Sequence, residues 1–152
     1  MTRLLLVLAL ALLSGCYRLS APPAMSEAVK LEISGNKTHL VRFQPYLQDE
    51  VAKALERQLG WRVSPTGTAT LGLSIRLEDL DNTAKDDRGV AIRWRISMHG
   101  DFLLTHHGGN LLGTFAGVGS AAGLNDEDAA LRGAAKGAAS DLVARLEAGL
   151  GH

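Results

Sequence analysis

Apolar and polar residues alternate along several stretches of the chain, and this pattern predicts strands with one buried face. The first stretch, residues 29–33, ends at Gly35-Asn36. The most regular stretch covers residues 69–77, with an apolar residue at every odd position. A third covers residues 90–98, and Phe102 and Leu104 keep its parity beyond Gly100.

Two loops and a return strand complete the expected sheet. The acidic segment from Asp79 to Arg88 predicts a loop between the second and third strands. The segment His106-His107-Gly108-Gly109-Asn110 is typical of a hairpin loop. Residues 112–115 then predict a return strand, which we expect to end in the small-residue stretch 116–123.

A helical period of apolar residues follows Gln44-Pro45, where proline suits the first turn of a helix. Its buried stripe consists of Leu47, Val51, Leu55 and Leu59. Gly60 is a suitable residue just beyond the helix end, and Trp61 is placed to make the hydrophobic contact that accompanies such an end.

A last helix is predicted after Asn125, which can cap it, with Asp126, Glu127 and Asp128 near its positive end. Its Ala-rich face would let it approach the sheet closely. Gly133 and Gly137 have the GxxxG spacing, but the charges between and around them exclude a membrane helix. The apolar stripe consists of Leu131, Ala135, Ala138, Leu142 and Leu146.

The order strand, helix, three strands, helix predicts an α+β fold (β-α-β-β-β-α). We expect a two-layer sandwich, in which a mixed four-stranded sheet carries two helices on one face. The uncovered face of the sheet would carry a polar set of side chains: Thr70, Ser74, Arg76, Arg93, Arg95 and Ser97.

The first sixteen residues, MTRLLLVLALALLSGC, have the features of a bacterial lipoprotein signal. Arg3 precedes an apolar run from residue 4 to residue 13, which is too short to span a bilayer. Leu13-Ser14-Gly15-Cys16 resembles a lipobox, and Cys16 is the single cysteine of the chain. We therefore expect a signal peptide over residues 1–15, a lipidated tether over 16–28 and one α+β domain over 29–150.

The composition narrows the possible functions. The 152 residues include 16 basic and 16 acidic side chains, so the chain lacks the positive charge that nucleic-acid binding requires. Acylation of Cys16 would anchor the protein to a membrane without a spanning helix. Tyr17 follows the cysteine, and resemblance to lipoprotein sorting in enteric-type bacteria, where Asp at this position favours inner-membrane retention, implies an outer-membrane anchor that faces the periplasm.

No catalytic motif is present, so we expect no enzymatic activity and no cofactor. The chain has no Gly-x-Ser-x-Gly elbow, HExxH motif or P-loop. We expect no metal site, because His106 and His107 are neighbours in a loop and the acidic segment 79–87 lacks the order of a calcium loop.

Arg76, Arg93 and Arg95 are the candidate ligand-binding residues. If the strands pair as expected, the three guanidinium groups share one face of the sheet. Arginine forms bidentate hydrogen bonds with phosphate, which suits a phosphorylated glycolipid. The alternative is a solvated sheet face whose charges only discourage strand pairing.

The chain resembles the LPS-assembly lipoproteins of the LptE type over nearly its whole mature length. The resemblance begins at Cys16-Tyr17-Arg18-Leu19, although the family often has glycine after the cysteine. Asn36-Lys37-Thr38 stands where that family has an Asn-x-Thr turn, and residues 47–55 match its helix pattern. The strand at 69–75 and the Ala-rich last helix complete the match.

The resemblance implies a protein that plugs an outer-membrane β-barrel translocon, assists its assembly and contacts lipopolysaccharide through basic residues. The partners would be that barrel, lipopolysaccharide and the membrane. The alternative functions are an auxiliary lipoprotein of a lipid-transport ABC system and an activator of a periplasmic synthase, which use similar small α+β domains.

Overall fold

A computed structural model describes residues 28–36, 42–122 and 126–151. The expected signal peptide, Cys16, nearly all of the expected tether and the cap residue Asn125 lie outside the described residues. So do Lys37 and Thr38 of the expected turn.

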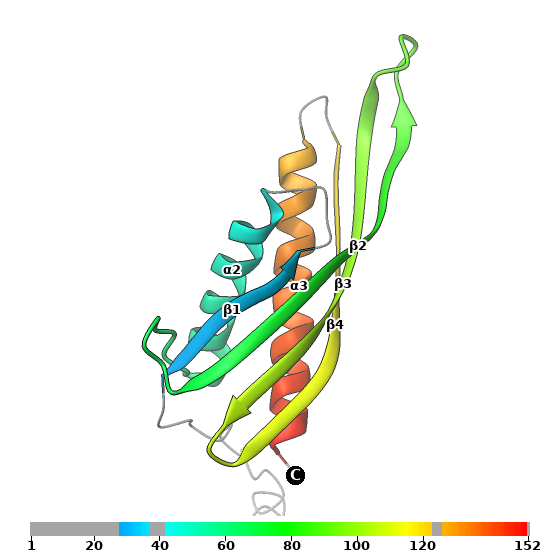
Figure 1. The fold of residues 1–152 in the computed structure, drawn as a ribbon. Helices are drawn as coiled ribbons and strands as arrows, with labels where there is room; N and C mark the ends of the chain where they lie inside the picture. The colour runs from blue at the N-terminus through cyan, green and yellow to red at the C-terminus, as the bar shows by residue number, and fades with distance from the viewer. Residues whose placement is uncertain (1–27, 37–41, 123–125, 152) are drawn as a thin grey trace, which may run out of the picture.

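The sheet has four strands in the order β1-β2-β3-β4. β1 is parallel to β2, and the other neighbours are antiparallel. Two helices, α2 and α3, lie together on one face (Figure 1), which confirms the predicted α+β fold. The elements are β1 (Val29–Asn36), α2 (Phe43–Ala54), the π-helix η1 (Leu55–Leu59), β2 (Ala69–Lys85), β3 (Ala91–His106), β4 (Gly109–Ala122) and α3 (Glu127–Leu150).

The core lies between the sheet and the helices, and it is built from the alternation seen in the sequence. Every second residue of β2 from Ala69 to Ile75 is fully buried, as are Ile96 and Leu104 of β3. The helices bury the stripes that their 3.6-residue period predicts. Transfer of each buried valine, leucine or isoleucine side chain from water contributes about 1.5–3 kcal/mol to folding, before the entropic cost.

The first helix begins at Phe43, one residue before the predicted start, and its last turn is a π-helix. The N–H groups of Gly60 and Trp61 both point to the carbonyl of Leu55, the latter at 3.2 Å. Gly60 is left-handed with φ 67°, a conformation that glycine adopts without a steric cost. Trp61 is 1% exposed, which confirms the predicted hydrophobic contact at this end.

The return strand was predicted to dissolve on entering the small-residue stretch at residue 116, but β4 continues through that stretch to Ala122. Gly117 and Gly119 lie on the buried side of the strand, directly under the backbone of α3. A Cβ atom on Gly117 would overlap the carbonyl of Ala134, and one on Gly119 would overlap that of Ala130. The strand lacks apolar alternation here because the helix backbone fills the space that side chains would occupy.

The expected acidic loop is also a strand for most of its length. β2 runs to Lys85, and a turn at Asp86–Val90 leads into β3 at Ala91. Asp86 Oδ1 accepts hydrogen bonds from the N–H groups of Arg88 (2.9 Å) and Val90 (2.8 Å), which fixes the turn. The end of this hairpin projects past both helices (Figure 1).

Both edges of the sheet are partly covered. The N–H of Ala116 in β4 donates to Oδ2 of Asp141 in α3 at 2.9 Å. At the other edge, the N–H of Val29 in β1 donates to the carbonyl of Arg62 at 2.8 Å. The N–H of Ser64 donates to the carbonyl of Val29 at 2.9 Å. Covering an edge in this way prevents its pairing with another chain.

A polar contact joins the two helices near the start of α3. Tyr46 Oη donates to Asp128 Oδ1 at 2.6 Å, and Arg132 Nε donates to Asp128 Oδ2 at 3.1 Å. The guanidinium of Arg132 also lies 4.8 Å from the centre of the Tyr46 ring. The residue that flanks the helix start is Asp126, which makes no capping hydrogen bond with its side chain.

Within the described part of the chain, no helix is both long enough and apolar enough to cross a membrane.

Candidate functional site: the open face of the sheet

The face of the sheet away from the helices carries the polar residues predicted for it. Arg93, Arg95 and Ser97 have the opposite parity to the buried Ile96 and Met98. Arg76 pairs directly with His99 across β2 and β3, and Thr70 pairs with Thr105. Directly paired residues share a face, so the whole predicted set lies on the open side.

The three arginines do not form one cluster. Arg76 stands opposite His99, whereas Arg95 lies four residues further along β3, which is about 14 Å at the rise of a strand. Arg76 Nη2 also lies 2.9 Å from Oδ2 of Asp101, so a carboxylate partly neutralises its charge. Arg93 and Arg95 remain together nearer the projecting hairpin.

Small neighbours leave Arg93 and Arg95 accessible. Arg93 pairs with Ala122 and Arg95 with Ser120, so the adjoining β4 side chains are short. A shallow hollow of about 380 Å³ lies here, and it is lined by Arg93, Ser120, Ala121 and Ala122. Among the described side chains, none forms an ion pair with either arginine.

The chemistry of this hollow suits an anion more than a catalytic reaction. Arg93 lines the hollow and Arg95 stands two residues away on the same strand, and each can offer a fork of N–H donors to phosphate oxygens. The backbone register places Asp81 opposite Arg95 on β2.

An interrupted apolar strip on the open face was not anticipated from the sequence. The strip consists of Leu103, Leu112 and Val118, which are 40%, 72% and 54% exposed. Val118 is opposite Ser97 and near the arginines, whereas Leu103 lies eight residues along β3 from Arg95, about 27 Å away. Leu103 and Leu112 are direct cross-strand partners, and β4 contains no charged residue in its 14 positions. The absence of charge over residues 109–122 is the sequence signal that could have revealed the strip.

The hairpin loop predicted over residues 106–110 is a two-residue turn, His107-Gly108, since His106 ends β3 and Gly109 begins β4. The Gly108 N–H donates to Nδ1 of His106 at 3.1 Å, and Gly109 takes a positive φ of 127°. Across the residues that the structure describes, no three His, Cys, Asp or Glu side chains gather in a way that could hold a metal ion.

Comparison with known proteins shows that the chain is similar to solved structures in fold. No protein-family model and no curated protein matches the chain. Rare lipoprotein B from Shewanella oneidensis is similar in structure with a TM-score of 0.50 and 13% identity, covering 82% of this chain and 99% of that one. The PelC dodecamer from Paraburkholderia phytofirmans also has a TM-score of 0.50 and 13% identity, covering 84% and 94%.

Proposed function

We propose that this protein is a lipid-anchored lipoprotein of the outer membrane, on its periplasmic side, with a binding role and no enzymatic activity. In this proposal it partners a β-barrel translocon and assists the assembly of lipopolysaccharide at the outer membrane. The observation that carries the proposal is the open sheet face, which presents Arg93 and Arg95 at the hairpin end and the exposed Leu103 and Leu112 at the other end.

The lipid anchor rests on the sequence. Cys16 follows an apolar signal and two small residues, and it is the only thiol in the chain. The fold is one that a lipoprotein from another bacterium also has. Acyl chains on Cys16 would hold the domain at the membrane surface, since each buried CH₂ contributes about 0.8 kcal/mol.

The open face has the mixed chemistry that an amphipathic lipid presents. Phosphate groups of lipopolysaccharide would bind to the guanidinium groups of Arg93 and Arg95. The strip formed by Leu103, Leu112 and Val118 is apolar and exposed, so it is suited to contact with acyl chains or with the wall of a barrel. Neither contact requires a catalytic group.

Co-purification tests the partner directly. The lipidated full-length protein, extracted in mild detergent from its own bacterium, should carry an outer-membrane β-barrel protein with it. A Cys16→Ser variant should lose the membrane anchor and appear in the soluble periplasmic fraction. Recovery of the wild-type protein alone, under conditions that preserve other outer-membrane complexes, would count against the proposal.

Lipopolysaccharide binding tests the arginines. We expect the double variant Arg93→Ala/Arg95→Ala to bind lipopolysaccharide at least tenfold more weakly, because loss of a hydrogen bond to a charged group costs about 1.5–3 kcal/mol. The matched control is Arg62→Ala/Arg88→Ala, which removes the same charge from exposed positions elsewhere. Equal binding by the two double variants would remove Arg93 and Arg95 from the site.

A second candidate function is that of a self-assembling scaffold, because PelC has the same fold at the same TM-score and forms a dodecamer. Light scattering on the purified full-length protein separates the two candidates. A defined ring-sized oligomer without a barrel partner would favour the scaffold, and a complex with one barrel would favour the translocon partner.

A further inference from the structure

A second polar site lies on the helical side of the molecule, away from the open face of the sheet. It is a groove with α2 and η1 on one side and α3 on the other. The groove is a small hollow of about 130 Å³. Drug-sized ligands need about 300–1,000 Å³, so this hollow suits only a small chemical group. It is lined by Glu50, Lys53, Ala54, Arg57, Gln58, Lys136, Ala139 and Ser140.

The floor of the groove is made of alanines. Ala54 is 9% exposed and Ala139 is 2% exposed, so the two helices approach closely and the polar side chains stand at the rims. Lys53 and Arg57 are four residues apart on one rim, and Lys136 and Ser140 are four residues apart on the other. Residues at this spacing lie on the same face of a helix, so each rim presents two polar groups to the groove.

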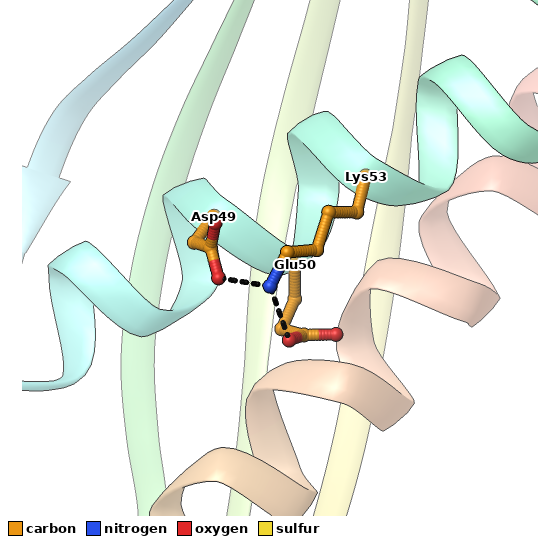
Figure 2. A network of polar contacts seen from close by, with 3 residues as sticks. All are labelled: Asp49, Glu50 and Lys53. Carbon is orange, nitrogen blue, oxygen red and sulfur yellow. Dashed lines mark hydrogen bonds and ion pairs between the residues drawn. The ribbon is translucent and has the colours of Figure 1, made fainter.

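Lys53 is already bound to carboxylates. Its ammonium group forms ion pairs with Asp49 and with Glu50, the latter at 3.5 Å (Figure 2). Glu50 is the only acidic residue among the lining residues, and the ion pair with Lys53 occupies it. The pKa of Lys53 is raised, chiefly by its hydrogen bond to Asp49, so it stays charged and keeps these carboxylates engaged.

Arg57 and Lys136 therefore face the groove as the surplus positive charges. Among the residues described, no carboxylate lies within ion-pair distance of either, and Ser140 makes no hydrogen bond through its hydroxyl. Two cations and a hydroxyl from facing helices can surround a tetrahedral anion, with the guanidinium donating in a bidentate manner.

The π-helix gives a separate indication at the same place. η1 covers Leu55–Leu59 and so contains Arg57 and Gln58, two of the lining residues. A π turn accommodates one more residue than an α-helical turn, at a cost in hydrogen-bond geometry, and such turns occur frequently at functional sites. Here the wider turn carries Arg57 and Gln58 on the rim opposite Lys136.

We propose that this groove binds a phosphoryl group through Arg57, Lys136 and Ser140, independently of the open face of the sheet. The group could be supplied by free phosphate or by a phosphorylated lipid headgroup, since both present the same tetrahedral anion. Lys53 remains bound to Asp49 and Glu50.

The test is a titration of the lipidated full-length protein in detergent, followed by the amide NMR shifts of residues 57, 136 and 140. Inorganic phosphate and short-chain phosphatidic acid are titrated separately, each against chloride at the same ionic strength. Saturable shifts at these three residues with either probe support the site. A response to both identifies the phosphoryl group as sufficient, and a response to phosphatidic acid alone identifies a lipid headgroup.

Variants complete the design. Arg57→Gln/Lys136→Gln should raise the dissociation constant for the phosphate probe at least tenfold, and Ser140→Ala should raise it less. Arg62→Gln/Arg88→Gln removes the same charge outside the groove, so it should titrate like the wild type. No saturable shift with either probe, or unchanged binding by Arg57→Gln/Lys136→Gln, would overturn the proposal.

Discussion

Single glycines decide how closely α3 can lie on β4. Gly117 and Gly119 alternate on the buried side of the strand, and Gly133 and Gly137 face them from the helix. A Cβ atom on Gly133 would lie 3.3 Å from Cα of Gly119, and one on Gly137 would lie 3.5 Å from Cα of Gly117. The GxxxG spacing noted in the sequence therefore serves helix-on-strand packing in this protein.

A methyl group at Gly119 should destabilise the fold. In the Gly119→Ala variant the new Cβ meets the backbone of α3 at Ala130 and Ala134, which cannot rotate away. We expect the free energy of unfolding to fall by about 1–3 kcal/mol, the usual cost of overpacking. Urea denaturation measures this change.

The control for that variant is Gly72→Ala on the open face. Its Cβ would have the carbonyl of Leu103 as its near neighbour at 3.7 Å, which is ordinary contact. If both variants lost the same free energy, helix contact could not be the cause.

At the same scale, the Tyr46 hydroxyl holds the pKa of Asp128 below its ordinary value, and the Arg132 charge contributes further. A lowered pKa in the folded state stabilises the fold above the unfolded pKa, and this stabilisation is lost as pH falls through the folded pKa. Tyr46→Phe should raise the pKa of Asp128 in a carbon-13 NMR titration of its carboxyl. Arg132→Gln should raise it less, and the reverse order would show that the charge dominates.

At the level of elements, the parallel β1 and the antiparallel hairpins follow closely from the sequence. Strict alternation of apolar and polar residues over 69–75 predicts β2, because one side of the strand is buried and the other faces solvent. The extension of β2 and the second half of β4 could not be predicted in this way. The projecting hairpin extends beyond the helices, and β4 exposes its glycines to a helix backbone, so hydrophobic alternation is weak in both.

Protection of the β4 edge depends on one carboxylate of α3. Asp141 accepts from the Ala116 N–H and also from Nε of Arg145, each at 2.9 Å. In an Asp141→Ala variant the Ala116 amide should exchange with deuterium about tenfold faster or more, because a charge-assisted hydrogen bond is lost. Amide exchange followed by NMR measures the rate.

Asp101→Ala is a suitable comparison for this measurement. It removes a carboxylate that binds Arg76 on the open face and lies on β3, away from the edge. Unaltered exchange at Ala116 in Asp141→Ala would show that the helix, and not its carboxylate, shields the edge.

At the scale of the whole molecule, the end of the β2–β3 hairpin projects from a two-layer body of sheet and helices (Figure 1). The buried residues of β2 end at Ile75 and those of β3 begin at Ile96, as far as side chains are described. The candidate arginines lie where the hairpin leaves the body. The sequence could place all three on one face by parity, but not separate Arg76 from the others, since that depends on strand register and on Asp101.

Shortening the hairpin should spare the fold. Replacement of residues 85–92 by Asn-Gly would join Ala84 and Arg93, which are cross-strand partners, through a two-residue turn. We expect the free energy of unfolding to change by less than about 1 kcal/mol, because the described core lies elsewhere. Thermal and urea unfolding test this, and a collapse of stability would show that the hairpin belongs to the core.

The close packing of α3 on β4 also has a kinetic consequence. Gly119 and Ala130 are close in space, and only a short segment of chain separates them. The pairing of β1 with β2, in contrast, closes a loop that contains the whole of α2. Contacts of short sequence separation cost little loop entropy and form early. The C-terminal half therefore offers a nucleus on which the parallel strand docks last, so mutations in β1 should speed unfolding and leave the folding rate almost unchanged.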